Sequence, residues 1–305
     1  MYYPVLRGKQ FELIALRELA PRLSPETICP IIEPVRNKYP ALAKTIKNLN
    51  ECQFKPIIVI NPSIGDFSKL SSRVNISDDL NSCLEEKINY LPCITTKDLS
   101  VEELQIFVEN IDDFAIFVEG GLSKGHLPIL RDASLVISTK YQKSVFKDLT
   151  HVVIVKDNFE RATRNSDYPD KSFFSEIHTD FREEKNIIGF GDYTITGGDF
   201  SESGGPAYVV TVHFSYIDSN AFNAMYIRHF KSFDDSSPTR PGEKFGDALN
   251  QLIDFTKNNK DIICNTLGLH GFNQLYKDGH FPGLGQVKKL SIQHHVETIC
   301  NYLER

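Results

Sequence analysis

The sequence has no tryptophan, only two methionines and only six cysteines among its 305 residues. None of the cysteines forms a C-x-x-C pair, and most lie in apolar runs, as Cys29 does in ETICPIIEPV. We therefore expect small buried hydrophobic side chains rather than a disulfide framework or a zinc site. A chain of this length can bury enough apolar surface to fold without such cross-links.

Long apolar runs and an excess of positive charge are also missing. No run of about eighteen apolar residues occurs, so we predict no membrane span. The opening MYYPVLRGKQFEL lacks the apolar core and small-residue cleavage site of a signal peptide, so we expect a cytoplasmic protein. The net charge of −6 disfavours a general nucleic-acid-binding protein, which would usually be basic. The phosphate-binding G-x-x-x-x-G-K-[ST] loop, the G-x-S-x-G elbow and the H-E-x-x-H metal motif are absent as well.

What the sequence has is an alternation of short apolar, β-branched runs with amphipathic stretches. The expected strands are 27–34, 56–61, 90–95, 114–119, 134–139, 151–156, 187–195, 207–216 and 225–231. The expected helices are 10–19, 41–49, 78–87, 101–110, 127–132, 143–149, 170–184, 243–257 and 288–303. Several early strands are apolar throughout, which is typical of parallel strands covered on both faces.

Repeated strand–helix–strand units predict a parallel sheet with right-handed crossovers. We predict an α/β fold, a (β/α)8 TIM-barrel-like single domain over residues 1–305. An open doubly wound sheet is the alternative, but no glycine-rich dinucleotide turn follows the first expected strand. The barrel would carry an N-terminal helix segment (1–26), a glycine-rich loop and added hairpin (196–231) and a C-terminal helical extension (260–305). One arm of the hairpin, left unspecified, would be the eighth barrel strand, and 267–285 would be an irregular connection.

Barrel enzymes place their active sites at the carboxyl ends of the strands, so the polar residues there are site candidates. We expect catalytic acid–base groups or metal ligands at Glu33 and Asp192, and an acid–base group at His213. The expected ligand-binding residues are Arg7, Lys9, Asn61, Glu119, Lys156 and Arg228. Lys156 and Arg228 would hold an anionic group. The alternative for each is a solvated or ion-paired charge, and for His213 a structural histidine. The cofactor stays open, a divalent metal included.

Glycines are concentrated in IIGFGDYTITGGDFSESGGP. This run contains Gly189, Gly191, Gly197, Gly198, Gly204 and Gly205. Glycine allows close backbone approach, and exposed N–H groups in such loops can hold a phosphate. A flexible surface loop with tight turns and a lid over the barrel are the alternatives.

The N-terminal stretch YYPVLRGKQFELIALREL and the later CPIIEPV resemble the uncharacterised "beta" family of bacterial and phage proteins. The residues that carry the resemblance are Arg7, Gly8, Lys9, Glu12, Leu16, 30–34, Asn61-Pro62 and Gly191-Asp192. The resemblance implies a barrel-like α/β domain from mobile-element or defence-associated gene neighbourhoods, without an established activity. It also draws attention to Arg7 and Lys9, which would reach the site if their segment closes over the barrel. An exposed Lys9–Glu12 ion pair is the alternative.

Three functions remain open at this point. The first is a hydrolase or lyase, within a phage-defence or mobile-element system, that acts on a phosphorylated small molecule, nucleotide or nucleic acid. The second is a non-catalytic, immunity-type component that binds a protein encoded nearby. The third is a sensor that binds a nucleotide or phage signal without turnover. The sequence does not decide whether the chain is an enzyme.

Overall fold

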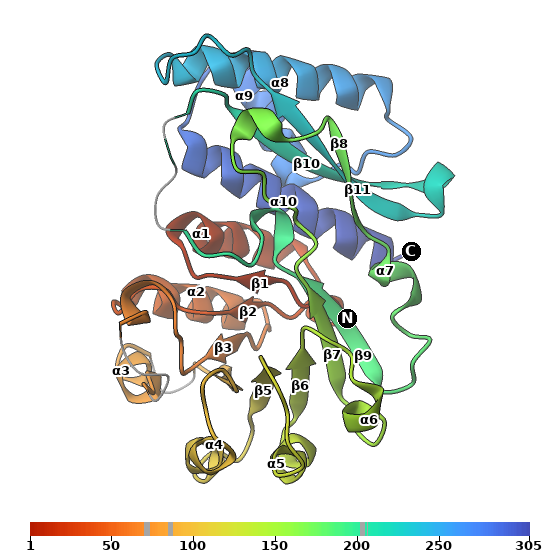
Figure 1. The fold of residues 1–305 in the computed structure, drawn as a ribbon. Coiled ribbons are helices and arrows are strands. Elements are labelled where there is room, and N and C mark those ends of the chain that lie inside the picture. Colours follow the sequence, from red (N-terminus) through yellow and green to blue (C-terminus); the bar gives the residue numbers. More distant parts are fainter. Residues whose placement is uncertain (70–73, 85–87, 202–204, 206) are drawn as a thin grey trace. The chain divides into compact units, whose positions relative to one another are not determined.

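The computed structural model describes residues 1–69, 74–84, 88–201, 205 and 207–305 (Figure 1). Where the sequence favoured one domain over 1–305, the contacts group the chain into two compact units. The first comprises Met1–Asp157 and Asp180–Tyr193, and the second comprises Asn158–Thr179 and Thr194–Arg305. Within the described ranges, no helix is long and apolar enough to cross a membrane.

The predicted barrel is the first unit. Among the described residues its sheet has eight strands in the order β1-β2-β3-β4-β5-β6-β7-β9, and all neighbouring strands are parallel. The strands are β1 (Val5–Leu6), β2 (Ile31–Ile32), β3 (Ile57–Val59), β4 (Leu91–Thr95), β5 (Ala115–Val118), β6 (Leu135–Ser138), β7 (Val152–Lys156) and β9 (Ile187–Asp192). The helices α1 (Gln10–Leu19), α2 (Pro40–Glu51), α3 (Ser77–Asn81), α4 (Val101–Val108), α5 (His126–Asp132) and α6 (Lys143–Phe146) alternate with them. Of the predicted helix 78–87, the last three residues, 85–87, lie outside the described residues.

Alternating side chains fill the interior of the barrel. The buried interior cluster includes Val5, Ile31, Val59, Phe117 and Val155, which come from five different strands. The residues between them on each strand, such as Ile116 and Ile154, are also buried. Both faces of the strands are therefore apolar, which explains why the runs read as continuously hydrophobic.

The strand that completes the barrel is β1, so the prediction that an arm of the 207–231 hairpin does so is wrong. Tyr2 bridges Ile28 on one side and Phe190 of β9 on the other. The N–H of Tyr3 donates to the carbonyl of Phe190 at 2.8 Å. Only two residues of β1 have strand geometry, and the proline at position 4 obscures the pattern. The sheet is thereby nearly closed.

The second unit contains an antiparallel sheet and three long helices. Among the described residues the sheet order is β10-β11-β8, from β8 (Lys171–Ser175), β10 (Thr211–Asp218) and β11 (Ala224–Lys231). The predicted hairpin is confirmed, because β10 and β11 pair from Thr211↔Lys231 to Asp218↔Ala224. The helices are α8 (Pro241–Asn258), α9 (Leu267–Asp278) and α10 (Leu284–Leu303). Their apolar side chains, including Phe245, Leu252 and Phe272, form a core with Phe214 and Phe230 of the sheet.

Two expected elements differ from the structure. The predicted helix 170–184 is instead β8 followed by the short helix α7 (Ile177–Asp180), and β8 was missed because KSFFS has a charged or polar residue at three of its five positions. The predicted irregular connection 267–285 is largely α9, whose N-cap Thr266 accepts from the N–H of Leu269.

The expectation of buried cysteines holds for Cys93 and Cys300, whereas Cys83 is exposed. All six thiols are unpaired in the described chain.

Candidate functional site at the carboxyl ends of the barrel strands

The interior of the barrel changes from apolar to polar where its strands end. Two residues after an interior position, the pleat returns the chain to the same face. Val5 is thus followed by Arg7, and Phe117 is followed by Glu119. We call the polar ring the six residues that this step reaches at the ends of β1, β2, β3, β4, β5 and β9, namely Arg7, Glu33, Asn61, Thr95, Glu119 and Tyr193. Four residues predicted for the site belong to it. Barrel enzymes bind their substrates at this end.

Arg7 is held in the ring by two acidic side chains. Its guanidinium pairs with the carboxylate of Glu33, and the side chains are only 12% and 11% exposed. Its backbone N–H donates to Glu12 Oε2 at 2.7 Å, and the N–H of Lys9 donates to the same oxygen at 3.3 Å. Gly8 has a φ of +63°, so this turn favours glycine. The buried Glu12 therefore fixes the turn that presents Arg7, and Lys9 is the N-cap residue of α1.

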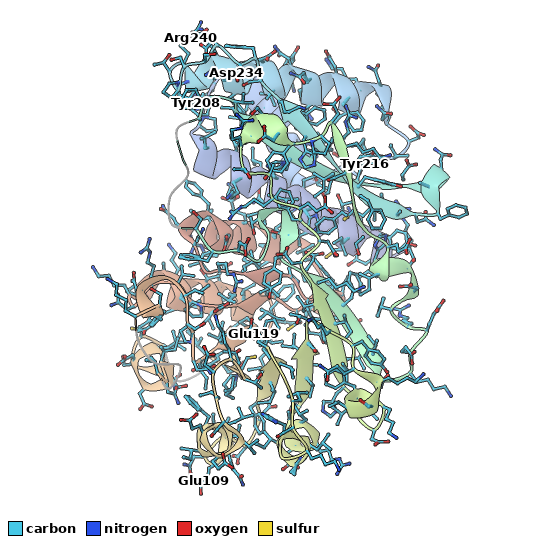
Figure 2. All side chains as sticks on the ribbon, viewed as in Figure 1. Glu109, Glu119, Tyr208, Tyr216, Asp234 and Arg240 are labelled. Carbon is cyan, nitrogen blue, oxygen red and sulfur yellow. The ribbon has the colours of Figure 1, made fainter. Side chains whose placement is uncertain are left out.

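A second set of hydrogen bonds orients the carboxylate of Glu119. The hydroxyl of Thr95 donates to Glu119 Oε2 at 2.6 Å (Glu119 is labelled in Figure 2). Asn61 uses both ends of its amide on the backbone of Thr95, at 2.9 and 2.8 Å. Asn61 therefore joins the ends of β3 and β4, a structural task, while Thr95 orients the carboxylate of Glu119.

Tyr193 is a member of the ring that the sequence analysis missed. The guanidinium carbon of Arg7 lies 4.9 Å from the centroid of its ring. Burial raises the pKa of Tyr193 to about 12; the charge of Arg7 opposes this, and the carboxylates of Glu119 and Asp157 add to it. The phenol therefore keeps its proton at neutral pH and can donate a hydrogen bond. Extending the alternation of β9 two residues beyond Gly191 would have found it.

The same alternation moves two predicted residues off the interior face. Asp192 lies between the interior positions Gly191 and Tyr193, and its Oδ1 accepts a 2.8 Å hydrogen bond from the hydroxyl of Tyr2. Lys156 pairs in register with Asp192 and is exposed. Strand-end position alone does not tell the two faces of a strand apart, and this is why both residues were expected in the barrel.

The remaining two predicted residues belong to the second unit. His213 is in β10 and Arg228 is in β11, so neither ends a barrel strand. Their assignment to the barrel rested on the hairpin supplying its eighth strand, which is corrected above. His213 Nδ1 lies 2.8 Å from His229 Nδ1, and His229 Nε2 lies 2.8 Å from Ser172 Oγ. Burial lowers the pKa of His213 well below its usual value and that of His229 to about 4.

Two glycines of the predicted phosphate loop, Gly189 and Gly191, lie against the N-terminal segment. A Cβ at Gly191 would lie 2.1 Å from the carbonyl oxygen of Tyr3, and a Cβ at Gly189 would lie 2.4 Å from the ring of Tyr3. These two glycines permit the close approach of β9 to the N-terminal segment. Gly204 lies outside the described residues.

No cluster of three or more histidine, cysteine, aspartate or glutamate side chains suited to a metal ion occurs in the described ranges. Comparison with protein-family models, curated proteins and solved structures gave no match for this chain.

Proposed function

We propose that the barrel unit is an enzyme, a hydrolase or lyase, that acts on a phosphorylated small molecule or nucleotide at the polar ring. The observation that carries the proposal is the Arg7 guanidinium, which is shielded from water beside Glu33 and Tyr193. A planar guanidinium binds phosphate oxygens in pairs, so Arg7 matches the geometry of a phosphate group. Electrostatic attraction to an anion also strengthens where water is largely excluded.

Glu119 and Tyr193 are the acid–base candidates in this proposal. The hydrogen bond from Thr95 orients the carboxylate of Glu119, so that it would take a proton from the substrate or from a water molecule. Tyr193, with its pKa of about 12, would donate a hydrogen bond to the oxygen on which negative charge develops. Glu33 would act as a positioning residue, since it touches Arg7.

We also propose that the protein serves in a bacterial phage-defence or mobile-element system. This part of the proposal rests on the resemblance carried by Arg7, Gly8, Lys9 and Glu12. A partner encoded nearby belongs to the same proposal, as does a location in the cytoplasm.

Ligand-induced thermal stabilisation tests the proposed site. Purified protein would be heated with phosphate, a set of nucleotides or sugar phosphates. A ligand at about a hundred times its dissociation constant adds roughly 2.7 kcal/mol of stability. The shift should vanish in an Arg7→Gln, Glu33→Gln double variant, which removes both charges and leaves no unpaired ion. Glu119→Gln should keep the shift but lose turnover.

Glu109→Gln is the matched control, because Glu109 is exposed on the outer surface of the barrel unit (Figure 2). It should behave like the wild-type protein in both assays. A shift that persists in the double variant, or no shift with any of these ligands, would overturn the proposal. The next experiment would then be copurification with the products of neighbouring genes, which tests the non-catalytic partner role.

A further inference from the structure

An aromatic row crosses the three-stranded sheet of the second unit. It consists of Phe173 on β8, Tyr226 on β11 and Tyr216 on β10, which are direct neighbours in the strand register. The ring centroids are 5.9 Å apart for Phe173 and Tyr226, and 6.0 Å apart for Tyr226 and Tyr216. The three side chains therefore lie on one face of the sheet, whose strands can be followed in Figure 1.

The row is covered at one end and open at the other. Tyr216, labelled in Figure 2, is buried, and its ring lies 5.5 Å from that of Phe255 on α8. Tyr226 is partly exposed, and Phe173 is 52% exposed. The exposed ring of Phe173 offers a flat apolar face on which a ligand can stack. Ligand contact is therefore expected at the β8 end.

Two cations lie beside the row, on the strands β8 and β11. Lys171 and Arg228 are directly opposite each other on β8 and β11, two residues from Phe173 and Tyr226 and hence on the same face. Like charges in this position destabilise a sheet. In the described chain neither cation forms an ion pair with a carboxylate.

The two cations contact aromatic rings instead. Lys171 Nζ lies 3.7 Å from the centroid of Tyr226, and the guanidinium carbon of Arg228 lies 5.2 Å from that of Phe255. Arg228 Nε is buried without a hydrogen-bond acceptor among the described residues. The sheet thus holds two positive side chains at directly paired positions, and in the described chain neither forms an ion pair with a carboxylate.

We propose that this face binds single-stranded nucleic acid. A base would stack on Phe173 and the edge of Tyr226, and a backbone phosphate would lie between Lys171 and Arg228. Aromatic side chains beside a basic groove are the general means of binding single strands, because every base has a flat face. The net charge of −6 disfavours broad binding along a duplex. The site is therefore short and local, and independent of the polar ring.

Fluorescence anisotropy tests the proposal with labelled oligothymidylate and oligouridylate of about ten nucleotides, a common footprint for such sites. Both should bind more tightly than a duplex of the same length. Phe173→Ala should weaken binding about tenfold or more, the loss of roughly one stacked base. Lys171→Gln should weaken it and reduce the slope of log affinity against log salt by about 0.7.

Phe222→Ala is the matched control, because Phe222 is 93% exposed and lies in the hairpin turn outside the row. It should bind as the wild-type protein does, and so should the Arg7→Gln, Glu33→Gln double variant. Wild-type affinity in Phe173→Ala, or equal affinity for the duplex, would overturn the proposal. Competition by an acidic peptide but not by a mononucleotide would also overturn it, in favour of a protein ligand. Loss of binding only in the double variant would assign the nucleic acid to the polar ring.

Discussion

Two glycines decide whether β9 can complete the barrel. Gly189 and Gly191 face the interior, and the backbone and ring of Tyr3 occupy the space that their side chains would need. Pairing between Tyr3 and Phe190 depends on that approach. The glycines therefore contribute to the site indirectly, since they permit the closure that leaves Arg7 of the N-terminal segment beside Tyr193.

Gly191→Ala should destabilise the protein by at least 2 to 3 kcal/mol, about the cost of an overpacked core position. Its Cβ would lie 2.1 Å from a backbone oxygen, which can move only if the strand moves. Urea unfolding measures the loss. Gly205→Ala is the control, because its Cβ would meet nothing within 4 Å. Equal stability of the two variants would contradict this account of closure.

The polar ring shows which part of a site can be predicted from strand ends. Glu33 and Glu119 were predicted to lie at strand ends because polar residues that end apolar runs are visible in the sequence. Asp192 and Lys156 were assigned to the interior because strand-end position does not distinguish adjacent residues that face opposite sides. Counting in steps of two from Val155 and Gly191 leads instead to Asp157, which is exposed, and to Tyr193, which belongs to the polar ring.

Helix packing in the second unit depends on close contact between α9 and α10. A Cβ at Gly268 would lie 2.2 Å from the carbonyl oxygen of Leu290 and 2.6 Å from the backbone nitrogen of His294. His294 itself is buried, stacks on Phe214 at 3.7 Å and lies 2.7 Å from the hydroxyl of Thr266. Gly268 thus allows α10 to reach both the start of α9 and the sheet.

Gly268→Ala should lower the midpoint of thermal unfolding by several degrees, the effect of a loss of about 2 kcal/mol or more in a chain of this size. Gly246→Ala provides the opposite case, because it lies inside α8 with nothing within 4 Å of its Cβ. It should stabilise the helix by roughly 0.5–1 kcal/mol. Calorimetry of both variants checks the pair, and a stabilising Gly268→Ala would refute the close packing.

Ser100 begins α4 with a reciprocal pair of contacts. Its hydroxyl accepts from the N–H of Glu103 at 3.2 Å, and the carboxylate of Glu103 accepts from the N–H of Ser100 at 2.9 Å. Ser100→Ala should cost about 1 kcal/mol, the usual value of an N-cap. Ser100→Asp should restore most of it, which denaturant titration would detect. An unchanged midpoint in the alanine variant would show that the cap is dispensable.

Regular elements were easier to predict than the ones that complete each unit. The apolar runs from β2 to β7 predicted a parallel sheet, and the amphipathic spacing of α8 predicted a helix. β1 was missed because it has only two residues. β8 was missed because it carries a charged or polar residue at three of its five positions. Tertiary pairing rather than local propensity defines both strands.

At the scale of the whole molecule, buried histidines make stability depend on pH. His213 faces His229, Lys288 and the rings of Phe159 and Tyr168, while His229 also faces Arg228, Lys231 and Asp170. The pKa of His229 is lowered from 6.5 to about 4, and that of His294 to about 3, mainly by burial. The unfolded chain therefore takes up protons below pH 6.5 that the folded chain refuses.

Stability should be highest above pH 6.5 and should fall as the pH decreases toward 4. Each of the three histidines with a lowered pKa, His213, His229 and His294, contributes a slope of about 1.4 kcal/mol per pH unit in this window. Urea unfolding at about pH 7, 6 and 5 measures the slope. A His213→Gln, His229→Gln double variant should have a shallower slope, whereas His280→Gln, at an exposed position, should not. Equal slopes in all three proteins would mean that the pair is not neutral when folded.

The nearly closed barrel also sets an order of events during synthesis. Tyr2 contacts Asp192 across 190 positions of sequence, so the segment that contains β1 must wait for β9, the last barrel strand. Between β7 and β9 the chain also makes β8, which pairs with β11 of the other unit. Such distant pairings slow folding and leave strand edges open on the growing chain. Until β9 emerges from the ribosome, β1 and β7 lack a neighbour on one edge, and a chaperone that shields nascent strands would act in that interval.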